Sequence, residues 1–157
     1  MKQRINAFEK GQKAMKALYG FGSHLAKCSI EHQLLNLVYY RVSQINGCAF
    51  CLDMHSKDLL VQGESEQRLF VMDAWREAPF YSDRERAALA WAEAVTKLTA
   101  QNVPDEVYEE ARKEFSEEEL IDLTIGVLAI NSYNRINIAF RTPAGSYMPG
   151  QYAVKAN

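Results

Sequence analysis

The spacing of the apolar side chains restricts the fold of this chain more than any other feature. Along most of the 157 residues they recur three or four positions apart, which is the period of an amphipathic helix. The chain has only four prolines, and none stands beside a strand-like run of alternating apolar and polar residues. We therefore predict an all-α fold.

Signals for helix ends divide the chain into a series of expected helices. Ser29 is a candidate N-cap, Asn46-Gly47 is a helix break, and Gly63 is placed to end a helix. Capping-box patterns begin at Ser82 and Ser116, each with a glutamate three residues later. The helices are expected over about 3–25, 29–45, 48–62, 65–78, 82–98, 104–113 and 120–140.

The length of the chain fits one domain, since roughly 150 residues per domain is usual. Hydrophobic residues make up 48% of the chain and charged residues 24%, which is ordinary for a globular protein and excludes disorder. We expect a single helical domain over residues 1–157. Its core covers about 29–140, and an irregular tail with two prolines and two glycines covers 141–157.

Charge and hydropathy exclude several classes of partner. The net charge is −2, so no global attraction to nucleic acid or to an anionic membrane is expected. The N-terminus lacks the apolar stretch of a signal peptide, and no apolar run approaches the roughly 18–20 residues that span a bilayer. Three cysteines are too few for a secreted disulfide scaffold, and an odd number would leave one of them unpaired. We therefore expect a cytoplasmic protein.

Two of the three cysteines form the sequence Cys48-Ala49-Phe50-Cys51, and His55 follows four residues later. On a helix, which turns by about 100° per residue, these two thiols and the imidazole fall within a sector of about 60°. Both cysteines stand at the expected start of a helix, where free amides and the helix dipole stabilise a thiolate. His55, one turn beyond Cys51, is placed to take up or relay its proton. The pattern predicts a reactive dithiol that cycles between reduced and disulfide forms.

A structural role, a metal site and a thioredoxin-type fold are the alternatives for the same residues. Cysteines beside a histidine also occur as ordinary core residues, although the spacing and the Asn-Gly break favour a function here. Zinc requires a fourth ligand, for which the sequence offers only scattered candidates such as Asp53, His24 and His32. A thioredoxin-type fold requires βαβ units around the motif, whereas both flanks here are helical. We therefore expect neither a metal nor a cofactor.

The residues around the motif resemble the carboxymuconolactone decarboxylase superfamily, and above all its alkylhydroperoxidase AhpD-like branch. The resemblance is carried by residues 37–55, 73–77, 82–91 and 131–135. It implies an all-helical fold, a homo-oligomer (trimer or hexamer) and thiol-dependent reduction of organic hydroperoxides. By position, it implies that Cys51 is the attacking thiol, Cys48 its more exposed disulfide partner, and His55 part of a proton relay.

The chain departs from this branch at Asn36. The relay normally includes a glutamate twelve residues before the first cysteine, which is the position of Asn36. An amide cannot take up a proton, so His55 lacks the charged partner that would raise its basicity. We expect Asn36→Glu to raise peroxide turnover. Phe50 likewise stands where some members have a second histidine.

The leading hypothesis is an antioxidant enzyme that reduces organic hydroperoxides through Cys48, Cys51 and a histidine base, His55. A thiol or lipoyl-bearing partner protein would return it to the reduced form. One alternative is a decarboxylase-like or isomerase-like enzyme on the same scaffold, and another is a non-catalytic redox-sensing oligomer. Asn131 and Asn134, three residues apart on an apolar helix, are expected to hydrogen-bond the ends of neighbouring helices rather than to line a pocket.

Overall fold

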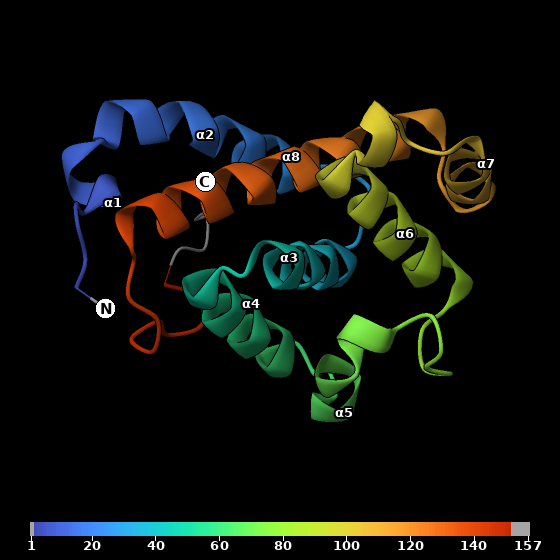
Figure 1. The fold of residues 1–157 in the computed structure, drawn as a ribbon, viewed down its shortest axis with the longest axis horizontal. Coiled ribbons are helices and arrows are strands. Elements are labelled where there is room, and N and C mark those ends of the chain that lie inside the picture. Colours follow the sequence, from blue (N-terminus) through green and yellow to red (C-terminus); the bar gives the residue numbers. More distant parts are fainter. Residues whose placement is uncertain (1, 152–157) are drawn as a thin grey trace.

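The longest helix runs along the whole molecule and organises the rest. In the computed structural model, which describes residues 2–151, α8 (Glu117–Phe140) crosses the length of the fold, and α2 (Gln12–Leu25) packs along it (Figure 1). α3 (His32–Asn46) packs against α4 (Ala49–Val61), α6 (Asp83–Lys97) and α8. The remaining elements are α1 (Ala7–Lys10), α5 (Glu66–Phe70), α7 (Asp105–Glu114) and the 3₁₀ turns η1 (Met72–Ala74) and η2 (Thr99–Gln101). Every element within 2–151 is helical, which confirms the predicted all-α class.

Helix α3 is central because it is buried on two sides. One group of buried side chains joins it to α8 and includes Val38, Val42 and Leu123, all at 0% exposure. A second group, on the other side of α3, includes Leu37 and Leu59. Since positions 37 and 38 are about 100° apart on a helix, consecutive residues of α3 enter different parts of the core.

Both predicted capping boxes are present. The Glu85 amide donates to Ser82 Oγ at 3.2 Å, and the Ser82 amide donates to Glu85 Oε2 at 2.8 Å. The same exchange joins Ser116 and Glu119 at 3.1 and 2.9 Å. These bonds satisfy amides that the first turn of a helix leaves free. α6 begins directly after Ser82, as predicted, whereas α8 begins at Glu117, three residues before the expected start at 120.

The first two helices differ from the prediction. The helix expected over 3–25 is divided into α1 and α2 at Gly11, where a Cβ atom would lie 2.7 Å from the Ala7 carbonyl oxygen. Ser29 does not cap the next helix, because α3 begins only at His32, after Ile30 has entered the core at 2% exposure. At the start of α3, packing of Ile30 sets the boundary, not the capping residue.

The prediction of one helix over 65–78 is also wrong, since only α5 and the 3₁₀ turn η1 form there. Leu69, Met72 and Trp75 are all buried and are three residues apart. Leu69 belongs to α5, Met72 to η1, and Trp75 follows η1 directly, so the segment buries these three side chains without forming one continuous helix.

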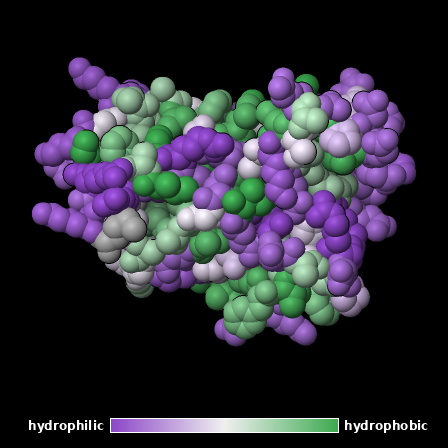
Figure 2. Space-filling view, viewed as in Figure 1, coloured by the Kyte–Doolittle hydropathy of each residue, from purple (hydrophilic) through white to green (hydrophobic). Residues whose placement is uncertain are grey.

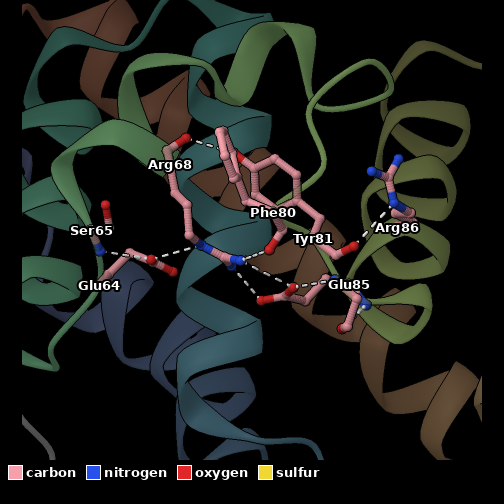
Figure 3. Close-up of polar contacts among 8 residues, drawn as sticks. Glu64, Ser65, Arg68, Phe80, Tyr81, Glu85 and Arg86 are labelled. Atoms are coloured by element: carbon pink, nitrogen blue, oxygen red, sulfur yellow. Dashed lines mark hydrogen bonds and ion pairs between the residues drawn. The ribbon is translucent and has the colours of Figure 1, made fainter.

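A cluster around Arg68 joins this segment to the start of α6 (Figure 3). The Arg68 guanidinium pairs with Glu64 at 2.8 Å and with Glu85 at 2.5 Å, and it donates to the carbonyl of Phe80. It also lies over the Tyr81 ring, 4.6 Å from the ring centre. Both carboxylates, of Glu64 and Glu85, are paired with the Arg68 cation. We therefore interpret the cluster as a structural link between this segment and α6.

A second buried ion cluster ties α3 to α6. Glu93 accepts from Arg41 Nε at 2.8 Å, from Trp75 Nε1 at 2.9 Å and from Arg76 at 2.9 Å. Burial raises the pKa of this carboxyl, but the donors outweigh burial and hold the pKa at about 2. Glu93 is therefore a fixed anion of the scaffold at neutral pH.

The chain after α8 is irregular, as predicted, and it packs against α4. Arg141 ends α8 with φ 57°, and Tyr147 is buried at 4% exposure. The Tyr147 hydroxyl donates to Asp58 at 2.8 Å, and Lys57 donates to the Tyr147 carbonyl at 3.1 Å. Residues 152–157 of the expected tail lie outside the described residues.

The surface carries both hydrophilic and hydrophobic residues. In Figure 2, hydrophilic residues cover the end that α7 forms, and hydrophobic residues gather at the lower edge, where Figure 1 places α5. Phe70 of α5 is 79% exposed and Val61 of α4 is 72% exposed. No helix in the described part of the chain is long and apolar enough to cross a membrane.

Candidate functional site

The site is built on the connection between α3 and α4. Gly47, with φ 67°, ends α3 in the left-handed region, and the Cys48 amide then donates to the Ser43 carbonyl at 3.0 Å. Asn46, the last residue of α3, links this turn to α8. Its side-chain amide donates to Asn131 and Asn134 of α8, at 2.9 Å each. α4 therefore starts at a defined place, with Cys48 as its N-cap. The predicted break and helix start are both confirmed.

The two thiols of the motif lie in hydrogen-bond contact, without a disulfide between them. Cys48 is 1% exposed and Cys51 0%, so both thiols are buried in this structure. The more exposed position that the resemblance implied for Cys48 stays a prediction. Cys48 Sγ also accepts the amide of Cys51 at 3.4 Å, as an N-cap side chain does. Both cysteines are placed by the first turn of α4.

The two thiols differ in acidity. The hydrogen bond from the Cys51 thiol lowers the pKa of Cys48 and outweighs burial, and the Cys51 amide adds to the effect. The bond to Cys48 and then burial raise the pKa of Cys51. The prediction that both cysteines are acidified is therefore correct for Cys48 and wrong for Cys51. If the pair loses one proton, Cys48 is the favoured thiolate, because the Cys51 thiol and the Cys51 amide both donate to its sulfur.

A cavity of about 500 Å³ lies beside Cys51. Its lining includes Cys51 and His55 but not Cys48, and it contains no Asp, Glu, Lys or Arg of the described residues. The side chains come from α1, α2, α3, α4 and α8 and are mostly apolar or aromatic: Phe8, Tyr19, Leu25, Tyr39, Phe50, Met54, Ala129, Ile130 and Tyr133, with Ser23 and Asn137 as further polar members. Such a cavity suits a neutral, largely apolar molecule.

His55 is the second polar group of the cavity that the sequence predicted. It is 6% exposed, and burial lowers its pKa to about 3, so the imidazole is neutral at pH 7. Its ring is tilted against Tyr39, with the ring centres 5.3 Å apart. Neither ring nitrogen has a hydrogen-bond partner within residues 2–151. A neutral imidazole has one donor and one acceptor, and in His55 both are left unpaired beside the cavity.

Other residues on the same side of α4 differ in burial. Leu59 is fully buried beside Leu37, whereas Leu52 is half-buried and Gln62 is exposed. α4 is therefore buried along one side as far as Leu59 and becomes exposed only after it, at residues 60–62.

Asn137 is a polar member of the site that sequence reasoning missed. It lies on α8, 4% exposed, and its Nδ2 donates to Cys51 Sγ at 3.4 Å. Its Oδ1 is buried and has no partner in the described part of the chain. A signal was present in the sequence, because Asn131, Asn134 and Asn137 recur three residues apart on an apolar helix.

Asn131 and Asn134 hold helices together, as expected, and do not line the cavity. Both accept from Asn46 at the end of α3, and Asn134 also donates to Ser43 Oγ at 3.1 Å. Their partners on the neighbouring helix are side chains, not the backbone groups that we expected.

Asn36 occupies the position of the missing relay glutamate. Its amide donates to Gln62 Oε1 at 3.1 Å, near the end of α4, and Asn36 is not part of the cavity lining. The α3 residue that contacts His55 is Tyr39, one turn further along the helix. The effect of Asn36→Glu on turnover stays a prediction.

Within residues 2–151, no group of three or more His, Cys, Asp or Glu side chains is arranged to hold a metal ion. His24, one candidate fourth zinc ligand, instead contacts Asp122 at 2.6 Å. Asp53, another, pairs with Lys57 at 2.8 Å.

Comparisons with known proteins agree on one family. The model of the carboxymuconolactone decarboxylase family matches residues 12–94. The uncharacterized protein YdfG of Bacillus subtilis (strain 168) is 41% identical over 93% of this chain and 99% of its own length. A solved protein of unknown function from Agrobacterium tumefaciens, which carries the name of the antioxidant defence protein AhpD, is 40% identical, with a TM-score of 0.88 over 93% of this chain and 100% of that one.

A more distant structure shares the fold alone. The debrominase Bmp8 is 23% identical, with a TM-score of 0.77 over 88% of this chain and 74% of its own. Family model, relatives and helical architecture together establish that this chain belongs to the carboxymuconolactone decarboxylase family, in its AhpD-like branch.

Proposed function

We propose that this protein is a thiol-dependent peroxidase that reduces organic hydroperoxides. The observation that carries the proposal is the position of Cys51 and His55 together in an apolar cavity, with the Cys48 thiol in contact behind Cys51. A peroxidatic thiol needs access to its substrate, a group that moves protons and a second thiol that resolves the product. Cys51, His55 and Cys48 supply these three requirements in that order.

In the first step, Cys51 sulfur attacks the terminal oxygen of the hydroperoxide. The S–O bond forms as the O–O bond breaks, so that Cys51 is oxidised to a sulfenic acid and the peroxide is reduced to an alcohol. The thiol proton passes to one nitrogen of His55, and the other nitrogen gives its proton to the departing alkoxide. Because the pKa of His55 is low, this paired transfer suits it better than the storage of a charge, so His55 acts as a base only within the step.

In the second step, Cys48 resolves the sulfenic acid. Its thiolate attacks Cys51 sulfur, a disulfide forms, and hydroxide leaves and is protonated to water. The lowered pKa of Cys48 favours this role, because the attacking form of the resolving thiol is the thiolate. A dithiol reductant, for which we propose a thiol or lipoyl-bearing protein, returns both cysteines to thiols and closes the cycle.

The cavity favours this chemistry over a lactone decarboxylase. A carboxylated lactone is an anion, and the lining offers no cationic side chain among the described residues. A variant of the debrominase Bmp8 in which alanine replaces one cysteine was solved in complex with 2,3,4-tribromopyrrole, a neutral halogenated ring. An aromatic-lined cavity beside a thiol would admit such a ring as well, so dehalogenation is the second candidate.

The test uses cumene hydroperoxide with dihydrolipoamide as the dithiol. The parent is expected to turn over, Cys51→Ser to lose both turnover and the sulfenic acid that dimedone traps, and Cys48→Ser to lose turnover while one equivalent of sulfenic acid accumulates. Cys28→Ser is the matched control, because that thiol donates to the Leu25 carbonyl at 3.2 Å and is not part of the cavity lining. Turnover that survives Cys51→Ser would overturn the proposal. Loss of bromide from tribromopyrrole without peroxide turnover would support the second candidate instead.

A further inference from the structure

Asn137 contacts the sulfur atom to which the proposed reaction assigns the attack. Its Nδ2 lies 3.4 Å from Cys51 Sγ, and the side chain lines the cavity beside His55. A donor at this distance favours a negative charge on the sulfur. It counters the two influences, the Cys48 bond and burial, that keep Cys51 protonated.

The other end of the same amide is free. Asn137 Oδ1 is buried, has no partner within residues 2–151, and belongs to a residue only 4% exposed. A buried carbonyl oxygen without a donor is costly, and native structures rarely keep one without a reason. The reason that fits here is a ligand that brings its own donor into the cavity.

We propose that Asn137 is a catalytic residue that holds Cys51 sulfur with Nδ2 and accepts the O–H of the hydroperoxide with Oδ1. The inference rests on the proposed function and specifies which peroxides the site takes: neutral, apolar molecules that end in O–O–H, not dialkyl peroxides that lack the hydroxyl. Because one planar amide contacts both groups, it places the terminal oxygen of the peroxide beside the sulfur. The hydroxyl of the sulfenic acid can keep the same acceptor after the S–O bond has formed.

Three variants separate the two ends of the amide. Asn137→Leu removes donor and acceptor while it keeps the number and branching of the side-chain heavy atoms. Asn137→Asp keeps the acceptor but removes the donor and adds a charge. Met54→Leu is the matched control, because Met54 lines the same cavity without a hydrogen-bond donor and the exchange conserves volume. Circular dichroism and thermal unfolding establish that each variant is folded.

The first measurement is the rate at which iodoacetamide alkylates Cys51, followed by mass spectrometry as a function of pH. Both Asn137 variants are expected to raise the midpoint pH by about one unit, and Met54→Leu to leave it unchanged. With peroxide, Asn137→Leu is expected to lower kcat/KM for cumene hydroperoxide by about 10- to 100-fold.

The second measurement tests the acceptor without turnover. 2-Phenyl-2-propanol and its methyl ether are compared as protectors of Cys51 from alkylation, since only the alcohol has an O–H. The parent and Asn137→Asp are expected to prefer the alcohol, and in Asn137→Leu that preference is expected to fall by about five-fold or more. An unchanged preference and an unchanged midpoint pH in folded Asn137→Leu would overturn the inference. A parent without peroxide turnover would instead refute the proposed function, while the protection experiment would still decide the role of Asn137.

Discussion

The burial of neutral His55 makes the stability of this protein depend on pH. The unfolded chain binds a proton at this histidine with a pKa of about 6.5. In the folded protein, burial lowers the pKa to about 3, so the folded state binds that proton much more weakly. Between these two values the unfolded state holds more protons, and the free energy of unfolding therefore falls as the pH falls.

The size of the effect follows from the two pKa values. On going from pH 7 to pH 5, the contribution of His55 to the free energy of unfolding falls by about 2 kcal/mol, and it saturates at a loss of about 5 kcal/mol below pH 3. Above pH 6.5 the stabilisation is fully present, and little further change is expected from this group. For a protein of ordinary stability, a loss of about 2 kcal/mol is a large fraction of the total.

Urea denaturation at fixed protein concentration, at pH 7, 6 and 5, measures this change directly. His55→Phe keeps an aromatic ring of similar size but has no group that titrates, so the parent should lose about 2 kcal/mol more than this variant between pH 7 and pH 5. The difference between parent and variant removes the contribution of every other group that titrates between pH 7 and pH 5. Equal losses in parent and variant would refute the conclusion that His55 is buried and neutral.

Three further predictions concern the scaffold, each measured as the free energy of unfolding by chemical denaturation. Arg68→Leu leaves the buried Glu64 carboxylate without its cation and should cost about 3–5 kcal/mol, part of which Glu64→Gln in the same chain should restore. Equal costs with and without Glu64 would show that the pair is not coupled. Leu123→Ala, at a fully buried position, should cost about 2–5 kcal/mol, and a cost below about 1 kcal/mol would contradict its place in the core. Ser116→Ala should cost about 1 kcal/mol and Ser116→Gly less, because the Oγ bond to the Glu119 amide is lost; no cost would mean that the cap does not stabilise α8.

Local signals determined most of the helix ends. The capping boxes at Ser82 and Ser116 and the break at Gly47 form where they were predicted, because each satisfies the ends of its helix with residues only a few positions away. The predictions failed where burial of distant side chains sets the geometry, as in residues 65–78, where Leu69, Met72 and Trp75 enter the core together. Periodicity alone does not contain that information, since it describes one helix at a time.

The same division holds for the site. The spacing of Cys48, Cys51 and His55 is a property of one helix, so the sequence by itself determined that these groups lie together. The tertiary structure decided that Cys51 is fully buried and borders the cavity. It also brought Asn137 to Cys51 from 86 residues away. These properties depend on desolvation and on contacts between helices, and both exist only once α3, α4 and α8 have packed against one another.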